Sequence, residues 1–578
     1  MSSNHTAITN SAFFNKLWHN AWKYLLIAAS LAATVKIIFF GFDIDEQYAV
    51  SMAYRMIRGD RMFLEMWEPH QTSAFFSAAF LWIYVHIFHS LNYAVIFLRF
   101  TGVFTQFMIS IFLFRTFCKM FSRETAFVTA IFYYNLIPKN STVPDFSNML
   151  LWFSTLSFLC FLEFYMAEQN FRSKRSAFFL IAAGINSALL VLSYPSCIII
   201  VIPWCIGLFL LSRSVNRFKN ILYYLGTCGI CAVCWLSYFL NHMSFSDFIY
   251  GLLQMSADGS HDVTIFEKIK AYFLLAFEVF PYFLVALAFA LIIYYILKAL
   301  LHKKYSLFLI LIITLSVEQG YIWYSLQKHL AYPGILYFLL PLYGIYKYLT
   351  SGKSEKNQKT NMHTAIYWFG SIASFFLLLA AVIVSNTPLY ESFGYMGIGM
   401  LASLCYLENE RVTCCNFWRT VLFFLLGIVI IHKAFMLYNI YGHDTIFVTR
   451  QKAESGPMAG IYGRYSDGYD YNIRGRLLDE YIPRGSKVLI VSHKTIMYLQ
   501  EGYDVCNYST ISTPTIDDRL FRYWSLYPDK VPEYIIWDKC SEGYIATNSD
   551  VNTKLVENAE LLADDEGLCI YKLPINPY

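Results

Sequence analysis

Acidic residues gather immediately after the first strongly apolar run of this 578-residue chain. Residues 42–71 read FDIDEQYAVSMAYRMIRGDRMFLEMWEPHQ. A carboxylate at such a place can take a proton from a hydroxyl group or bind a cation. Any catalytic role depends on the elements that position these groups, which are Asp43, Asp45, Glu46, Asp60, Glu65 and Glu68.

The DIDE segment predicts the start of a helix. Asp43 and Glu46 have the D-x-x-E spacing of a capping box, which opens a helix at its first turn. Asp45 then lies in that first turn, where the helix dipole favours a negative charge, so its carboxylate is ready to accept a proton or bind a cation. A helix start alone explains Asp43 and Glu46 and leaves Asp45 unexplained. Asp45 is therefore the first candidate catalytic residue.

A second acid, Asp145, lies in KNSTVPDFSNML, where it opens another apolar segment. One interpretation is a plain helix start after Pro144. The other is catalytic, because the predicted topology places Asp45 and Asp145 at the same side and depth of the membrane on separate helices. Two acids at one rim can share a metal ion, or one can act as the base while the other positions the acceptor.

Glu65, Glu68 and His70 form a third group, in LEMWEPH. Glu68 and His70 are candidate ligands of a divalent metal ion, the one cofactor that the sequence suggests. The spacing alone favours a solvated loop with a histidine satisfied by neighbouring groups, and both interpretations stay open.

Cationic side chains are predicted near the same face. Arg99 lies in the outer half of a predicted span, where an arginine is costly unless it faces the protein interior or a lipid head group. Lys36 lies near the outer end of the first span and could simply snorkel to the interface. Lys328 and His329 lie at the outer end of another span. Together these groups suit an anionic phosphate at the membrane surface.

The composition is that of a membrane protein, with 57% hydrophobic and 15% charged residues. In soluble chains, near half of the residues are hydrophobic and about a quarter are charged. The net charge of +4 gives no indication of a nucleic-acid partner, and we expect none. Apolar runs of about 20 residues recur and predict a mostly α, polytopic helical protein with about 13 transmembrane helices. These are 24–42, 93–114, 124–138, 146–166, 176–193, 196–212, 219–240, 271–297, 305–324, 331–349, 365–385, 392–407 and 417–437.

The run 72–90 decides the orientation. If it lies outside the membrane core and the N-terminus is cytoplasmic, nearly all Lys and Arg clusters face the cytoplasm, as the positive-inside rule requires. We therefore predict a multi-pass cell-membrane protein with a transmembrane domain over 1–439, whose outer loop 43–91 carries juxtamembrane helices. A small extracytoplasmic α/β domain follows over 440–578, with strands such as KVLIVS, EYIIWDK and LCIYKL.

These motifs resemble the GT-C glycosyltransferases, integral membrane enzymes that use polyprenyl-phosphate sugars. The likeness is greatest to the branch of protein O-mannosyltransferases and the lipid A aminoarabinose transferase. DEQYAVSMAYRMIRGD (45–60) is similar to their D-E…G-D segment, LEMWEPH (64–70) to their acid-rich loop, and VPD (143–145) to a later motif that opens a span. The segment 184–196 also resembles a family stretch. One departure is PHQTSAF, where many relatives have K-P-P after the loop glutamate.

The resemblance implies an inverting transfer of a hexosyl or pentosyl group from a polyprenyl-phosphate-linked donor to an acceptor hydroxyl on the outer face. Asp45 would be the general base and Asp145 its partner. Glu46, Arg99, Lys328 and His329 would bind substrate. A metal held by Glu68 and His70 could also neutralise the leaving phosphate. The implied partners are the lipid-linked donor, membrane lipid, and a glycan, lipid or protein acceptor.

The alternative is a transporter or flippase for a lipid-linked or small solute. Transporters place ionisable residues near the bilayer midplane on broken helices, often in repeated halves. Here the acids gather in an outer loop, and no internal repeat is visible.

Overall fold

The computed structural model describes most of the chain. The described residues are 3–138, 141–256, 264–301, 334–351, 358–384, 392–411, 426–439, 442–448, 450–511, 519–539, 555–565 and 567–574, with scattered positions between 307 and 318. Statements of absence below refer to these residues.

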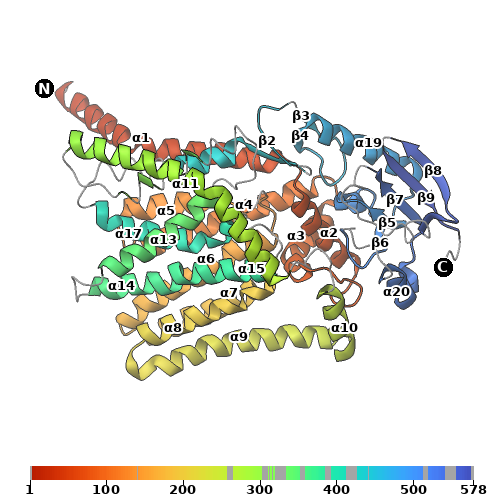
Figure 1. The fold of residues 1–578 in the computed structure, drawn as a ribbon, viewed down its shortest axis with the longest axis horizontal. Coiled ribbons are helices and arrows are strands. Elements are labelled where there is room, and N and C mark those ends of the chain that lie inside the picture. Colours follow the sequence, from red (N-terminus) through yellow and green to blue (C-terminus); the bar gives the residue numbers. More distant parts are fainter. Residues whose placement is uncertain are drawn as a thin grey trace.

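Long helices form a bundle in which they run side by side (Figure 1). Among the described residues, eight helices are long and apolar enough to cross a membrane, and three further apolar helices are shorter. The protein is therefore a multi-pass membrane protein, as the composition predicts. The bundle helices are α1 (Ser3–Phe39), α4 (Ala94–Phe117), α5 (Arg123–Asn135), α6 (Phe146–Gln169), α7 (Ser173–Ser193), α8 (Val201–Leu211), α9 (Arg217–Leu240), α11 (Ile265–Leu301), α13 (Gly334–Ser351), α14 (Gln358–Ile366), α15 (Ala373–Val384) and α17 (Gly397–Arg411).

These helices match the predicted spans closely. The predicted 93–114, 146–166 and 219–240 correspond to α4, α6 and α9, and the predicted 417–437 contains the helix Leu426–Phe435. Even the short segment 124–138 forms a helix, α5. Most of the predicted span 305–324 lies outside the described residues.

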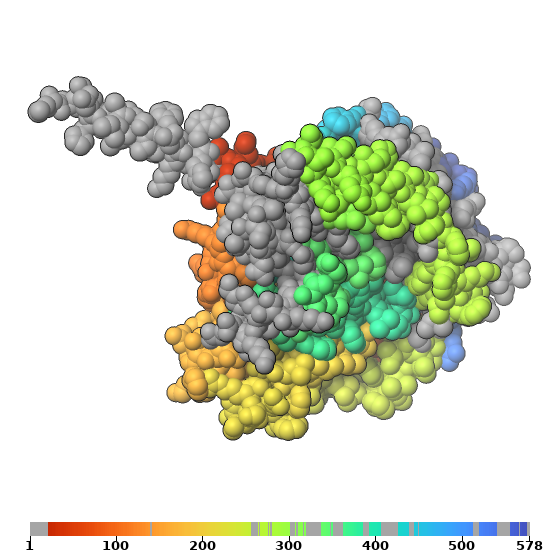
Figure 2. All heavy atoms as spheres, turned by 60° about the vertical axis from the view of Figure 1, so that its left-hand side comes forward, coloured from red at the N-terminus to blue at the C-terminus, as the bar shows by residue number. Residues whose placement is uncertain are grey.

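Burial separates the centre of the bundle from its surface. In α6, 89% of the most apolar window is buried, whereas the corresponding share is 6% in α9 and 11% in α11. Leu222, Ile230, Phe273 and Phe277 are among the large apolar side chains that these two outer helices expose. Figure 2 shows α9 in yellow and α11 in light green on the outside of the bundle. Such a surface is stable in hydrocarbon and not in water.

One end of the bundle carries the C-terminal domain and is called the domain end below. Helices α2 (Ile44–Arg58) and α3 (Ala74–Phe88) lie between the bundle and that domain, and α10 (Phe245–Ser256) lies at the same end (Figure 1). The N-terminus lies at the opposite end (Figure 1). By length and composition, the run Gln71–Phe88 could cross a membrane. Its placement outside the membrane core stays a prediction, as do the sides on which the termini lie.

The C-terminal domain is built on a five-stranded sheet of order β6-β5-β7-β9-β8. Strands β6 (Asp504–Val505), β5 (Lys487–Val491) and β7 (Tyr534–Asp538) are parallel, and β9 (Leu568–Lys572) and β8 (Glu560–Asp565) complete the sheet in antiparallel pairing. Around the sheet lie α19 (Tyr465–Tyr481), α20 (Arg519–Leu526) and the 3₁₀ helix η7 (Thr495–Leu499). The predicted strands at KVLIVS, EYIIWDK and LCIYKL are confirmed as β5, β7 and β9.

Two small hairpins join the bundle to this sheet. They are β1 (Met436–Asn439) with β2 (Gly442–Thr445), and β3 (Arg450–Lys452) with β4 (Tyr462–Arg464). The first hairpin spans the predicted boundary at 440, and the sequence did not predict either of them. The sequence also did not predict α19 or β8.

Candidate functional site

Helix α2 begins where the DIDE segment predicts. Asp43 is its N-cap, with an extended backbone, and its carboxylate accepts a hydrogen bond from the Glu46 N–H at 3.1 Å. Asp45 lies in the first turn and is half-buried, whereas Glu46 is fully buried. The cap therefore fixes the direction in which this first turn presents its acids.

The Glu46 carboxylate binds Arg99 on α4. Arg99 Nε donates to Glu46 Oε1 at 2.7 Å, and a terminal guanidinium nitrogen donates to Oε2 at 2.5 Å. Both side chains are almost completely buried. Arg99 also donates to carbonyl oxygens at the end of α1, including Ile38 at 3.0 Å and Gly41 at 2.9 Å. These last carbonyls of α1 have no partner within the helix, and a guanidinium has enough donors to satisfy several of them.

A turn at residues 141–145 joins this ion pair to α6. Ser141 Oγ donates to Glu46 Oε1 at 2.7 Å. The Asn148 side-chain amide donates to the carbonyls of Ser141 and Val143 at 2.8 and 2.9 Å, which holds the turn closed. Asp145 then caps α6 by accepting from the Asn148 N–H at 2.7 Å. The segments of the two predicted catalytic aspartates are therefore in direct contact.

The turn lies very close to α4, and a glycine makes this possible. A β-carbon added at Gly102 would stand 1.6 Å from the Thr142 carbonyl oxygen, so no other residue fits there without displacing the turn. Thr142 Oγ1 also donates to the Arg99 carbonyl at 3.3 Å. Position 102 thus sets the distance between α4 and the turn that carries Asp145.

The predicted substrate-binding residues have different surroundings. Glu46 and Arg99 bind each other at the junction of α1, α2 and α4, so in this structure they hold the framework. Their contact with substrate stays a prediction. Lys328 and His329 lie outside the described residues.

The predicted metal ligand Glu68 is fully buried and bound by protein groups. Its Oε1 accepts from Arg55 at 2.9 Å and from the Thr510 N–H at 3.0 Å, and its Oε2 accepts from the Thr510 hydroxyl at 2.9 Å. Burial raises the pKa of Glu68, and the ion pair with Arg55 and the bonds from Thr510 oppose that rise.

His70 belongs to different surroundings from Glu68. Its ring stacks on Phe146, with centroids 4.1 Å apart and planes at 9°, and it lies 5.6 Å from the Tyr194 ring. The described residues contain no group of three or more His, Cys, Asp and Glu side chains that could hold a metal ion. Glu68 is thus bound by Arg55 and Thr510, and His70 packs on aromatic rings, so a metal ion held by these two residues stays a prediction.

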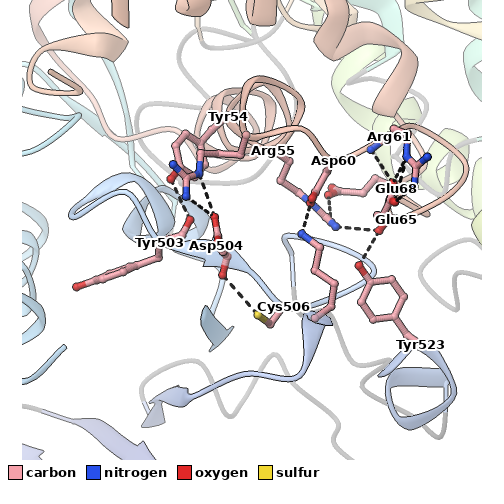
Figure 3. A network of polar contacts seen from close by, with 12 residues as sticks. Tyr54, Arg55, Asp60, Arg61, Glu65, Glu68, Tyr503, Asp504, Cys506 and Tyr523 are labelled. Carbon is pink, nitrogen blue, oxygen red and sulfur yellow. Dashed lines mark hydrogen bonds and ion pairs between the residues drawn. The ribbon is translucent and has the colours of Figure 1, made fainter. Parts of the chain in front are cut away.

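The Glu68 contacts belong to a polar network that joins the 42–71 segment to the C-terminal domain (Figure 3). Arg55 also binds Asp60 at 2.8 Å, and Asp60 pairs with Lys530. The Tyr523 hydroxyl donates to the Glu65 carbonyl at 3.0 Å. Burial opposes the charge on Arg55, but Asp60 and Glu68 raise its pKa. The acid-rich loop is therefore held by the sheet domain.

Aromatic packing continues this contact between the loop and its surroundings. The Trp67 ring stacks on Tyr508, with centroids 5.7 Å apart, and meets Tyr523 edge-on at 5.2 Å. On another side Trp67 lies 5.8 Å from Tyr250 of α10. The helix in the 241–268 loop thus covers the acid-rich segment.

Sequence reasoning missed several residues of this region. Ser141 and Thr510 are ordinary polar residues whose partners lie far away in the sequence, so nothing in their own surroundings marks them. Lys433 was missed as well, although a lysine in an apolar run is costly and could have marked it. It is considered below.

No family model and no curated protein matches the chain. Solved structures resemble it over nearly its whole length. The Archaeoglobus fulgidus oligosaccharyltransferase, solved with a tethered acceptor peptide, is 13% identical with a TM-score of 0.47, covering 98% of this chain and 76% of that chain. ArnT from Cupriavidus metallidurans, in the apo state, is 10% identical with a TM-score of 0.44, covering 96% and 98%.

ArnT bound to undecaprenyl phosphate gives 11% identity and a TM-score of 0.42. The structural neighbours are GT-C membrane glycosyltransferases. They belong to the superfamily that the sequence motifs resemble. Because the identities and TM-scores are low, the function is argued below from the residues of this chain.

Proposed function

We propose that this protein transfers a sugar from a polyprenyl-phosphate-linked donor to an acceptor hydroxyl at the outer face of the membrane, with inversion and with Asp45 as the general base. One observation carries the proposal: Asp45 lies in the first turn of a helix whose start is fixed by Asp43, Glu46 and Arg99 beside the turn that bears Asp145. A general base must be held in place to act on one proton of one substrate.

The environment of the three acids of DIDE supports this assignment. Asp43 caps the helix, and Glu46 is almost completely buried against Arg99. Asp45 is half-buried, so it is more exposed than either of the other two acids. The positive end of the α2 dipole favours its ionised form, the form that accepts a proton.

The reaction balances with this residue alone as the base. The acceptor oxygen forms a bond to the anomeric carbon while its proton passes to Asp45. The bond from the anomeric carbon to the phosphate oxygen breaks on the opposite face, and the polyprenyl phosphate leaves with the electron pair. The configuration at the anomeric carbon is therefore inverted. The leaving group gains negative charge, so cations near it lower the barrier.

Asp145 is proposed to position the acceptor. It caps α6 at the end of the turn that contacts Glu46, which places its segment against the first turn of α2. The acceptor can be a glycan, a lipid or a protein, since the described residues favour none of them.

The test is sugar transfer by the purified full-length protein in lipid nanodiscs. It uses a radiolabelled polyprenyl-phosphate sugar and follows release of polyprenyl phosphate. Asp45→Asn keeps the shape of the side chain and removes the base, so transfer should fall by about 10²- to 10⁴-fold. Asp43→Asn is the matched control, because asparagine caps a helix as well as aspartate does, and it should change transfer only slightly.

Undiminished transfer by Asp45→Asn would remove Asp45 from the mechanism. Solute or lipid transport by the wild-type protein, with no transfer from any sugar donor offered, would favour the transporter instead.

A further inference from the structure

Two buried lysines lie together at the domain end of α1. Lys36 is in the last turn of α1, and Lys433 is in the helix Leu426–Phe435, just before the C-terminal domain. Their exposed fractions are 7% and 4%. A lysine that snorkels keeps its ammonium in water, which such burial excludes. The snorkelling first considered for Lys36 is therefore not what the structure shows.

The groups that Lys433 contacts are neutral. Its ammonium donates to the Thr34 hydroxyl at 3.0 Å and to the Tyr134 carbonyl at 3.4 Å, and it lies 4.7 Å from the centroid of the Tyr134 ring. Hydroxyl, carbonyl and ring orient an ammonium without cancelling its charge. Lys433 is thus held in a fixed direction by groups that supply no counter-charge.

Lys36 forms fewer hydrogen bonds than Lys433 does. Among the described residues its ammonium has no hydrogen bond and no ion pair. The charged group that acts on it is another cation, Arg99, and the charged group that acts on Lys433 is Lys36. The buried carboxylate of Glu46 is already bound by Arg99. Two buried lysines therefore lie close together at the domain end, and no carboxylate of the described residues forms an ion pair with either of them.

Charges removed from water without a counter-charge are strongly unfavourable. A ligand that brings negative charge to this place removes the penalty. We propose that Lys36 and Lys433 bind the phosphate group of the polyprenyl-phosphate lipid, which rests on the proposed function because the same lipid is its donor and leaving group. A phosphate carries about one to two negative charges and several acceptor oxygens, which suits two ammonium groups.

The surface of α1 favours a phosphate borne by a lipid over a free one. Ile27, Leu31 and Val35 recur every four residues and are exposed along one face of the helix. That apolar stripe ends one residue before Lys36. An isoprenoid chain lying along the stripe would reach the turn of α1 that carries Lys36, whose own side chain is turned into the protein. The position also suits the chemistry, since Arg99 next to Lys36 is the residue that fixes the first turn of α2 with Asp45.

The test is lipid binding by the full-length protein in nanodiscs, with no sugar and no acceptor present. The ligand is radiolabelled undecaprenyl phosphate, and undecaprenol, which has the tail without the phosphate, gauges binding by the tail. The variants are Lys36→Met, Lys433→Met and both together, because methionine keeps the length of the side chain without the charge. Lys268→Met is the matched control. Lys268 is also 7% exposed, but its ammonium donates to the Ile383 carbonyl at 3.2 Å.

We expect each lysine variant to weaken binding of undecaprenyl phosphate at least tenfold and the double variant to lose the preference for it over undecaprenol. Thermal stability of the ligand-free protein should stay the same or rise, since an unbalanced charge is removed. The Lys268→Met control should bind as the wild type does.

Three results would overturn the proposal. Unchanged binding by the double variant would show that the lysines do not hold the phosphate. A lower melting temperature together with lost binding would show that they hold the fold. Equal binding of phosphatidylglycerol, or displacement of the lipid by inorganic phosphate at equal concentration, would show a general anion site.

This experiment is separate from that on Asp45. Asp45→Asn should bind undecaprenyl phosphate like the wild type and fail only in transfer. Lost binding in the lysine variants with retained transfer by Asp45→Asn would uphold the lipid site and reject the mechanism. The reverse pattern would uphold the mechanism and reject the lipid site.

Discussion

Two buried groups of charge lie at the domain end of α1, and they are balanced in opposite ways. In the first, Arg99 meets the Glu46 carboxylate and the carbonyl oxygens of Ile38 and Gly41. In the second, Lys36 and Lys433 face neutral groups and each other. In the first group the protein itself supplies the anionic partner of the cation. In the second group that partner would be the proposed lipid phosphate.

The difference separates residues that hold the site from residues that bind a ligand. In this structure Arg99 has oxygen partners from Glu46 and from the carbonyls near the end of α1, and its contact with substrate stays a prediction. Lys36 and Lys433 have no carboxylate partner among the described residues, so the proposed phosphate would be their first anionic partner.

The largest difference in stability between the two groups is expected at Arg99. Arg99→Met leaves the buried Glu46 carboxylate and the last carbonyls of α1 without their donor, so the free energy of unfolding should fall by about 3–5 kcal/mol. Fluorescence-detected thermal unfolding in detergent measures this. Lys36→Met should show no such loss. A similar loss of stability in the Arg99→Met and Lys36→Met variants would mean that both cations stabilise the fold.

A second substitution checks the Arg99 result. Glu46→Met added to Arg99→Met removes the stranded carboxylate and should restore part of the lost stability, since a buried pair replaced by apolar residues is often nearly neutral. No recovery would mean that the carbonyls of α1, and not Glu46, account for the loss.

Gly102→Ala tests the group around Arg99 and Glu46 by displacing Ser141, which donates to Glu46. The new methyl group would collide with the Thr142 carbonyl, so the turn that carries Ser141 and Asp145 must shift. We expect a loss of about 1–3 kcal/mol in stability and at least a tenfold loss of transfer. Gly226→Ala on α9, where nothing lies within 4 Å, is the control and should be neutral or slightly stabilising.

Ser141→Ala removes a single donor from the Glu46 carboxylate. Because the bond is to a charged and buried group, we expect a loss of about 1.5–3 kcal/mol in the free energy of unfolding. Binding of undecaprenyl phosphate should be unchanged, because Ser141 belongs to the group around Arg99 and Glu46. Weakened lipid binding in this variant would show that the two groups are coupled.

The smallest expected effect is at the cap. Asp43→Ala removes the acceptor for the Glu46 N–H and should cost about 1 kcal/mol. Asp43→Asn should cost little, because asparagine caps equally well. The difference between the two variants in thermal unfolding isolates the cap, and equal losses would show that the charge of Asp43 matters in itself.

Local features of this structure could be predicted from the sequence. The DIDE segment contains its own capping residue, so the start of α2 follows from four neighbouring residues. The apolar runs and the β-branched KVLIVS segment likewise specify their helices and strand locally. The sheet order and the hairpins between bundle and sheet were not predictable, because they depend on packing between distant segments.

In the candidate site, too, local features could be predicted and contacts between distant segments could not. The acids of DIDE and the cap at Asp145 were visible, but their roles depend on partners far away in the chain. Glu46 meets Arg99 across 53 residues, and Glu68 meets Thr510 across 442. Without those contacts, Glu68 resembled a metal ligand and Arg99 a phosphate ligand. A charge in an apolar run is detectable in the sequence, but the group that balances it is not.

The contact between the acid-rich loop and the sheet domain has a consequence for how the protein is made. The backbone N–H of Trp67 donates to the Tyr508 carbonyl, and the backbone N–H of Thr510 donates to the Glu68 carboxylate. The ribosome synthesises Glu68 442 residues before Thr510. The loop can therefore take its final shape only when the segment around Thr510 has been synthesised and has reached the same side of the membrane. A chain cut short before that segment would leave the loop without these partners, so the proposed sugar transfer would require the C-terminal domain.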